Sequence, residues 1–224
     1  MPSDAKSRIV VLHLTKYGES GVVLHAIDAS SGRRSFLVRG LKKSRGAAAA
    51  FHSLGLLDIV SRESPKSSLA YLHEWTPVAA LHGIRGDLVK GSVAMFISEV
   101  LYRSFTNELS DPQFFNWLCG TVAALDAETG SVANFPIWFL VSYAVQLGFR
   151  PGDPVEPQGL FSPEESALLQ RLLRATYEEG MAIPLSASRR QAFSRKLLQY
   201  LSHHLGATID AKSLDVLHAV LENN

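Results

Sequence analysis

The chain has 224 residues, of which 46% are hydrophobic and 19% are charged, a composition typical of a globular protein. The net charge of +1 gives by itself no indication of a polyanionic partner. Cys119 is the only cysteine, which excludes a disulfide framework and a multi-cysteine zinc module. Because apolar residues surround it, we expect Cys119 to be a buried structural thiol. We predict one or two domains and no bound cofactor or metal.

Residues 129–149 carry no charge and are long enough to span a bilayer. However, Asn134, Pro136 and Gln146 interrupt the stretch, and its longest wholly apolar run covers only residues 137–141. We therefore expect a buried core helix rather than a membrane span. The N-terminus is polar and lacks the apolar segment of a signal peptide, so we expect a cytoplasmic protein.

The first 80 residues are expected to form short β-strands. Runs of apolar and β-branched residues alternate there with turn-forming residues. We expect strands at residues 9–14, 21–27, 34–38, 54–60 and 67–73. Five short strands in so few residues predict a small closed or partly open barrel rather than a sheet with crossover helices.

After Thr76-Pro77 the apolar residues recur every three or four positions, which predicts helices. Asp111-Pro112 and Ser162-Pro163 each place a capping residue before a proline, the usual start of a helix. We expect helices over residues 89–101, from 112, over 135–149, from 163, and over 188–205 and 213–222. The predicted fold class is α+β, with a small β-barrel domain in residues 1–80 and an all-helical domain in residues 81–224.

The charges divide at the same place. Residues 1–80 carry 11 Lys and Arg against 6 Asp and Glu, whereas residues 81–224 carry 11 against 15. Six of the basic residues fall within 13 positions that contain no acidic residue: Arg33, Arg34, Arg39, Lys42, Lys43 and Arg45. The sequence therefore predicts a basic barrel and an acidic helical part.

The same residues give little indication of an enzyme. The serine of Gly18-Glu19-Ser20 lacks the glycine two positions later that a nucleophile elbow needs, since Val22 stands there. The loop from Gly40 to Gly46 lacks the Lys-Ser/Thr pair of a phosphate-binding loop. None of the eight histidines forms a metal-binding motif. We therefore expect neither catalysis nor a small-molecule substrate.

The basic run favours nucleic acid. Small barrels bind single strands along a basic groove in which aromatic rings stack on the bases. Tyr17, Phe36 and Tyr71 are candidates for such stacking, although each could instead pack in the core or at the rim. A solvated loop is the alternative interpretation of the charges.

The sequence also resembles the RecO family of recombination mediators. The resemblance rests on residues 11–20 (VLHLTKYGES), 32–40 (GRRSFLVRG), 97–103 (ISEVLYR), 139 with 147–151 (LGFRP), and 212–217 (KSLDVL). It implies an N-terminal OB-fold and covers nearly the whole chain. Many family members carry a four-cysteine zinc module after the LGF-like motif, but residues 152–161 contain no cysteine, so zinc is not implied here.

The resemblance implies a function and partners. It implies binding of single- and double-stranded DNA, strand annealing, and loading of recombinase onto strands coated by single-strand-binding protein. It further implies a RecR partner and a helical site for the acidic C-terminal tail of single-strand-binding protein. Some members have a basic residue one turn before Phe139, where this chain has Ile137. We therefore expect Arg103 to provide the cation for that tail.

Two classes of function stay open at this point. The first is a non-enzymatic DNA-binding and annealing mediator. The second is a protein-interaction adaptor whose barrel serves only as a docking face. The two classes differ in whether the barrel binds DNA with a strong dependence on salt.

Overall fold

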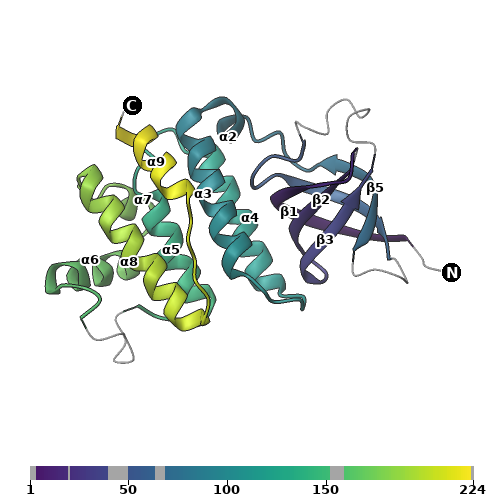
Figure 1. Cartoon of the computed structure of the whole chain (residues 1–224). Helices are drawn as coiled ribbons and strands as arrows, with labels where there is room; N and C mark the ends of the chain where they lie inside the picture. The colour runs from purple at the N-terminus through teal and green to yellow at the C-terminus, as the bar shows by residue number, and fades with distance from the viewer. Residues whose placement is uncertain (1–3, 20, 40–49, 64–68, 152–158, 223–224) are drawn as a thin grey trace. The chain divides into compact units, whose positions relative to one another are not determined.

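The computed structural model describes residues 4–19, 21–39, 50–63, 69–151 and 159–222. In these residues the strands β1 to β5 all precede residue 78, and helices α2 to α9 follow residue 81 (Figure 1). The fold is therefore α+β, with an N-terminal barrel followed by helices, as the sequence predicts.

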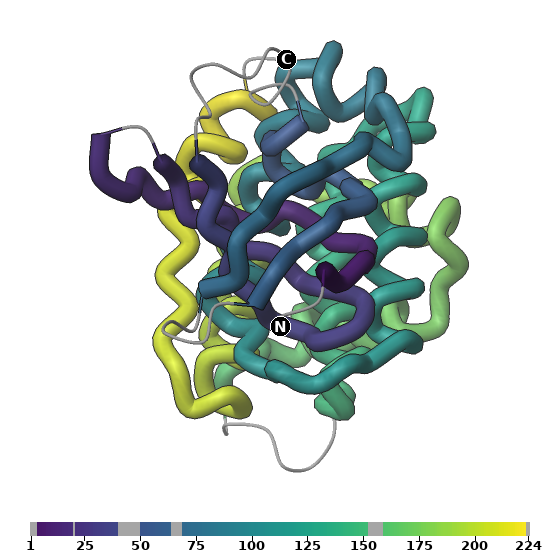
Figure 2. The backbone as a smooth tube through the Cα atoms, turned by 90° about the vertical axis from the view of Figure 1, so that its right-hand side faces the viewer, coloured from purple at the N-terminus to yellow at the C-terminus, as the bar shows by residue number. Residues whose placement is uncertain are grey.

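The five strands form a closed barrel in the order β1-β2-β3-β5-β4. The neighbours are antiparallel except for β3 and β5, which run parallel where Phe36 faces Ala70 and Leu37 faces Tyr71. Figure 2 traces these strands in purple and blue. Their bounds are β1 Asp4–Tyr17, β2 Gly21–Asp28, β3 Gly32–Val38, β4 Leu56–Arg62 and β5 Ala70–Pro77.

Strand β1 closes the barrel because it pairs along its length with two different strands. Residues 9–17 pair with β2, and residues 4–10 pair with β4. The strand begins five residues before its predicted start at Ile9, in a polar segment that shows no apolar run. Backbone pairing and two ion pairs with β4 hold that segment: Arg8 with Asp58 at 2.7 Å and Arg62 with Asp4 at 2.8 Å.

The interior of the barrel is filled by alternate residues of its strands, because successive side chains of a strand point to opposite faces. The strand residues of this core are Ile9, Val11, Leu24, Ala26, Phe36, Val38, Leu57, Ile59, Ala70 and Leu72. Phe36 is completely buried in this core. Full burial of one such aromatic side chain contributes roughly 1.5–3 kcal/mol of stability.

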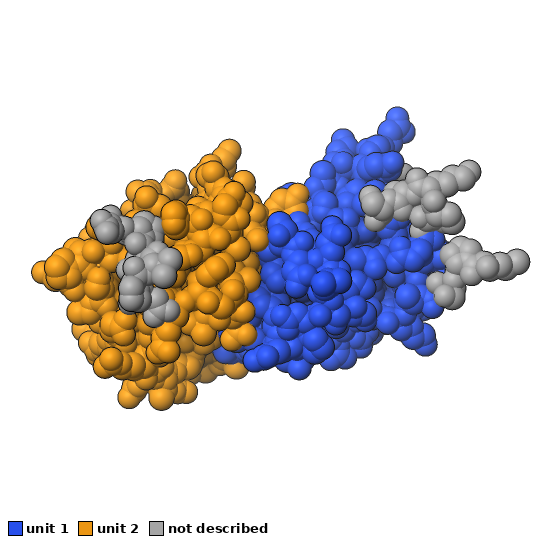
Figure 3. Space-filling view, turned by 90° about the horizontal axis from the view of Figure 1, so that it is seen from below, with its two compact units in different colours: residues 1–82, 105–126 blue, residues 83–104, 127–224 orange. Residues whose placement is uncertain are grey.

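The chain forms two compact units, coloured separately in Figure 3: residues 1–82 with 105–126, and residues 83–104 with 127–224. Residues 105–126, which include α4 (Pro112–Ala127), thus belong to the unit of the barrel. The prediction from sequence assigns this segment to the helical part instead. The division of the chain into two domains at residue 80 therefore stays a prediction.

The turn between β2 and β3 holds the segment that precedes α4. The backbone N–H of Arg33 donates to the carbonyl of Asn107 at 2.6 Å, and the Ser110 hydroxyl donates to the Ala29 carbonyl. Gly32 has a φ of +67°, and a Cβ there would lie 2.4 Å from the Asn107 carbonyl oxygen. Only glycine fits this turn, because any side chain would be both strained and in collision.

The second unit is helical. Its helices are α2 His82–Gly86, α3 Leu88–Ser104, α5 Phe135–Gln146, α6 Pro163–Arg174, α7 Tyr177–Met181, α8 Ala187–Leu205 and α9 Ser213–Glu222. Helix α5 lies at its centre and contacts α3, α6, α7 and α8, while α9 packs beside α3 (Figure 1). Most of α5 is buried, and Tyr143 shares a hydrogen bond of 2.9 Å with Ser104 of α3. This confirms the core helix expected within residues 129–149.

Among the described residues, none of the helices is long and apolar enough to cross a membrane.

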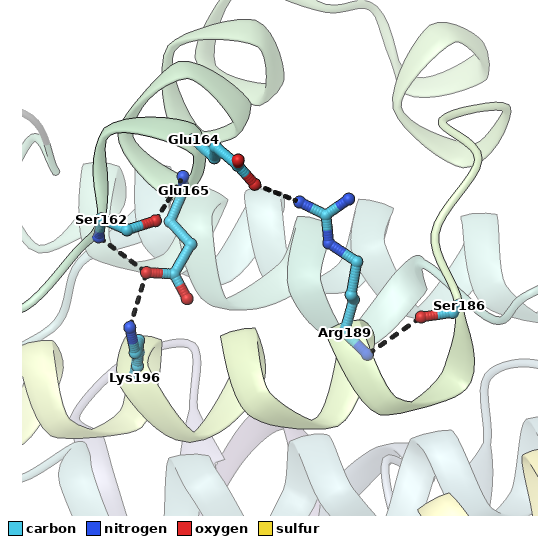
Figure 4. Close-up of polar contacts among 6 residues, drawn as sticks. All are labelled: Ser162, Glu164, Glu165, Ser186, Arg189 and Lys196. Atoms are coloured by element: carbon cyan, nitrogen blue, oxygen red, sulfur yellow. Dashed lines mark hydrogen bonds and ion pairs between the residues drawn. The ribbon is translucent and has the colours of Figure 1, made fainter.

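Helix α6 begins with the local signal expected from sequence, whereas the cap of α8 was not predicted. Ser162 caps α6 in a reciprocal capping box with Glu165, and Ser186 caps α8 through the backbone N–H of Arg189 (Figure 4). Glu165 also accepts from Lys196 of α8 at 2.6 Å. The acid of the α6 cap therefore joins the two helices.

Candidate functional site

Strand β3 carries two of the predicted DNA-contacting cations and a third follows it directly, and the structure gives each of the three different surroundings. The side chain of Arg33 belongs to the opposite face of the strand from the core residues Phe36 and Val38. Arg34 belongs to the same face as Phe36, near the end of the barrel. Arg39 follows the strand and is exposed.

Arg34 has a carboxylate partner from elsewhere in the barrel. Its Nη2 lies 2.5 Å from Oε1 of Glu63, which directly follows β4, and its guanidinium lies 5.7 Å from the centre of the Phe36 ring. The local sequence around the basic run contains no acid, so sequence reasoning missed this pair. The only signal available was that a closed barrel brings β4 and β3 near the same neighbour, β5.

Arg39 stacks on an aromatic ring. Its guanidinium carbon lies 5.1 Å from the centre of the Tyr71 ring, and its Nη2 donates to the Tyr71 hydroxyl at 3.4 Å. Tyr71 is half-buried on β5, whereas Tyr17 is 52% exposed. Phe36 is 0% exposed, so its candidacy for base stacking is wrong. The parallel pairing of β3 with β5 is what brings Arg39 and Tyr71 together.

The other three predicted contacts, Lys42, Lys43 and Arg45, lie outside the described residues. They follow Arg39 within six positions of the chain. Their proposed role therefore rests on the sequence alone.

A row of polar side chains crosses β1, β2 and β3 beside Arg33. The two ring nitrogens of His25 are within hydrogen-bond distance of Ser35 Oγ at 2.9 Å and Thr15 Oγ1 at 3.1 Å. Burial lowers the pKa of His25, and the positive charges of Arg33 and His13 lower it further. His25 is therefore mainly neutral at pH 7.

In the helical unit, the predicted tail-binding residue Arg103 forms an ion pair on its own helix. Its Nη2 lies 2.7 Å from Oε1 of Glu99, one turn earlier in α3. The other carboxylate oxygen of Glu99 accepts from the backbone N–H and the hydroxyl of Ser213, at the start of α9. Arg103 thus supports the carboxylate that holds the first turn of α9.

A groove in the same unit lies among α5, α8 and α9. Its lining residues are Ala133, Pro136, Ala187, Arg190, Gln191, Ser194, Leu214, Leu217, His218 and Leu221, and Arg103 is not among them. Arg190 donates through Nη1 to the Leu185 carbonyl, while its buried Nε has no hydrogen-bond partner among the described residues. Burial lowers the pKa of Arg190. The groove combines apolar walls with a cation that has a spare donor.

Burial raises the pKa of the Cys119 thiol, although the charge of Arg8 partly opposes this effect. A raised pKa keeps the thiol protonated and unreactive at neutral pH. Within the described part of the chain, no group of three or more His, Cys, Asp or Glu side chains could hold a metal ion.

The fold and surface first define a class, the OB-fold proteins with a helical C-terminal part. Two family models then match the chain: the N-terminal part of recombination protein O at residues 1–81, and its C-terminal part at residues 85–152. Together they cover well over half of the chain. The chain belongs to the RecO family of DNA repair proteins.

Curated relatives support this assignment over nearly the full length. DNA repair protein RecO of Flavobacterium psychrophilum is 29% identical in an alignment that is 234 residues long with its gaps and that covers 96% of this chain and 98% of the relative. The proteins of the same name from Porphyromonas gingivalis and Bacteroides fragilis are 27% and 28% identical. Their alignments cover 96% and 95% of this chain, and 98% and 97% of the relatives.

Glu99 gives a testable pH dependence. Burial opposes ionisation of this carboxyl, but the hydrogen bonds from Ser213 and Arg103 prevail and hold its pKa below the usual value of 4.5. Its contribution to stability is therefore fully present above pH 4.5 and is lost as the pH falls through the lowered pKa of the folded state. We expect Glu99→Gln to reduce the free energy of unfolding at pH 7 by about 1–3 kcal/mol.

Urea denaturation at pH 7 and at pH 3 measures this effect. The difference between wild type and Glu99→Gln should shrink at pH 3, which lies below the usual pKa of 4.5, because the carboxyl of the unfolded chain is already protonated there. Glu164→Gln provides the matched control, because Glu164 is 82% exposed. An equal difference at both pH values would contradict the assigned role of Glu99.

Proposed function

We propose that this chain is a non-enzymatic recombination mediator that binds single- and double-stranded DNA on its barrel. It anneals complementary strands and helps to load recombinase onto strands coated by single-strand-binding protein. RecR is its protein partner. We assign it no catalytic residue.

The observation that carries this proposal is the stacked pair of Arg39 and Tyr71. In the sequence, Arg39 is followed within six positions by the other basic residues of the run, Lys42, Lys43 and Arg45. A guanidinium and an aromatic ring offer a strand a phosphate contact and a stacking surface at adjacent positions. Arg33 and Arg34 extend the cationic surface along β3. Phosphate contacts position a strand without reading its bases, so the sequence preference should be weak and duplex DNA should also bind.

The groove of the helical unit supports the second partner, the tail of single-strand-binding protein. A tail that ends in acidic and apolar residues needs an apolar channel and a cation for its terminal carboxylate. The groove offers Leu214, Leu217 and Leu221 as walls and the positive charge of Arg190, which also lines it. Arg103 stays the sequence-based proposal for the same contact.

The alternative function, a protein-interaction adaptor, uses the barrel only as a docking face. The pairing of Arg34 with Glu63 favours it to some extent, because an internally neutralised cation attracts DNA less strongly. The salt dependence of binding separates the two functions, since counterion release accompanies DNA binding.

Replacement of Lys42, Lys43 and Arg45 together by alanine tests the DNA surface. For single strands, the slope of log affinity against log salt is about −0.7 per neutralised phosphate, so the triple variant should flatten the slope by up to about 2. Fluorescence anisotropy with a labelled single strand at several salt concentrations measures it. Annealing of complementary strands should slow in parallel, because both strands must be screened before they meet.

A matched control removes three positive charges from the helical unit by replacing Arg171, Arg174 and Lys212 with alanine. This control should keep the wild-type slope. Loss of exposed charges typically changes stability by no more than about 0.5 kcal/mol, so the control should remain folded. Circular dichroism checks the folding of the barrel variant. A folded barrel variant with the wild-type salt slope would rule out this surface.

The tail site is tested with an acidic peptide that ends in an apolar residue. Arg190→Ala should weaken its binding about tenfold or more, because a hydrogen bond to a charged group contributes about 1.5–3 kcal/mol. Isothermal titration with the peptide measures the affinity. A peptide with an amidated C-terminus, which lacks the terminal charge, should bind wild type and Arg190→Ala equally weakly.

Arg103→Ala, measured in parallel, separates the two proposed cations. If Arg103→Ala alone abolishes the preference for the free carboxylate, the contact belongs to α3 and not to the groove. If neither variant changes peptide affinity, the tail does not bind at either site.

A further inference from the structure

An open hollow on the barrel unit lies beside the basic strand, and its lining carries charges of both signs. Its lining residues are Ser31, Arg33, Arg34, Ser35, Glu63, Leu69 and Glu108. All belong to one compact unit, but they come from three separate stretches of the chain: strand β3 and the turn before it, the residues directly after β4 and directly before β5, and the segment before α4.

The formal charges of the lining residues cancel, since two of them are arginines and two are glutamates. The contact between Arg34 and Glu63 is direct, at 2.5 Å between Nη2 and Oε1. The side chain of Arg34 is 23% exposed and that of Glu63 is 58% exposed, so the guanidinium is held in place while the carboxylate stands toward solvent. Ser31 Oγ accepts a further hydrogen bond from Arg34 Nη1 at 3.4 Å.

We propose that Glu63 acts as a built-in competitor for phosphate at Arg34 and thereby limits the affinity of the barrel for a DNA strand. A carboxylate and a phosphodiester present similar anionic oxygens to a guanidinium. A bound strand exchanges its phosphate for the Glu63 carboxylate, which swings into solvent, while Phe36 and Ser31 keep Arg34 in position. Glu108 adds a second negative charge that repels the same phosphate. This proposal rests on the proposed DNA-binding function.

The physical consequence is weak and reversible binding at this point of the surface. Because the Glu63 carboxylate is exposed, its ion pair with Arg34 opens easily, and the exchange of the carboxylate for a phosphate costs little free energy. A mediator that anneals strands must also release the product, which a permanently free cation would oppose. Glu63 thus lowers the affinity of this site for DNA without itself contacting the DNA.

Glu63→Gln tests the proposal through a gain of binding. We expect the affinity for a single strand to rise about twofold to fivefold at constant salt, the range that corresponds to an exposed ion pair of up to about 1 kcal/mol. The slope of log affinity against log salt should steepen by up to about 0.7, because the displaced Glu63 carboxylate of wild type takes up a cation again and so offsets the counterion that the phosphate at Arg34 releases. Fluorescence anisotropy with a labelled oligothymidine measures both quantities.

Two further variants make the test specific. Glu74→Gln removes the same charge from an exposed position of β5 that does not line the hollow, so it reports the general effect of net charge. In an Arg34→Ala background, Glu63→Gln should give no more gain than Glu74→Gln, because the cation that it releases is absent. A gain from Glu63→Gln equal to that from Glu74→Gln, or one that persists without Arg34, overturns the proposal.

The outcomes also separate this proposal from the function on which it rests. If wild type binds the strand with a salt-dependent affinity and Glu63→Gln does not differ from Glu74→Gln, only the competitor role fails. If wild type and all variants fail to bind the strand at low salt, the DNA-binding function fails together with it.

Discussion

Closure of the barrel by β1 is the constraint on which the rest of the first unit depends. This strand pairs through its first half with β4 and through its second half with β2, so the sheet has no free edge there. Closure brings β3 and β5 together as parallel neighbours, and this pairing sets Arg39 on Tyr71. It also brings the end of β4 close enough for Glu63 to reach Arg34. The candidate DNA surface is therefore a consequence of topology as much as of composition.

The two units use charged residues in different ways. In the barrel unit, Arg34 and Arg39 lie against aromatic rings, and Arg34 also pairs with the exposed Glu63, an arrangement that a phosphate can enter. In the helical unit, many charges join helices: Glu99 holds the start of α9, and Glu165 links α6 to α8. This contrast shows how an almost neutral chain could carry the proposed DNA-binding surface. Net charge describes the whole molecule, whereas affinity depends on which cations remain available.

Much of the fold follows from local patterns. The alternation around Phe36 predicts a strand, and Ser162-Pro163 predicts the start of α6, because both signals depend on neighbouring residues. Contacts between distant residues could not be predicted in this way. The polar start of β1 shows no apolar run, Glu63 is 29 positions from Arg34, and the membership of residues 105–126 in the barrel unit depends on a turn at Gly32. Arg103 has the right charge for a tail site, and its pairing with Glu99 four positions earlier could have been inferred from helical spacing, but the groove at Arg190 emerges only in three dimensions.

The central claim, that DNA lies across β3 and β5 of the barrel, is tested most directly by photo-cross-linking. A single strand with photoreactive thymine analogues would be irradiated with the full-length protein, and the modified peptides would be identified by mass spectrometry. The account predicts cross-links to Tyr71 and to the peptide that contains residues 33–45, and their loss at high salt. Cross-links confined to residues 127–222, with the barrel unmodified, would contradict it.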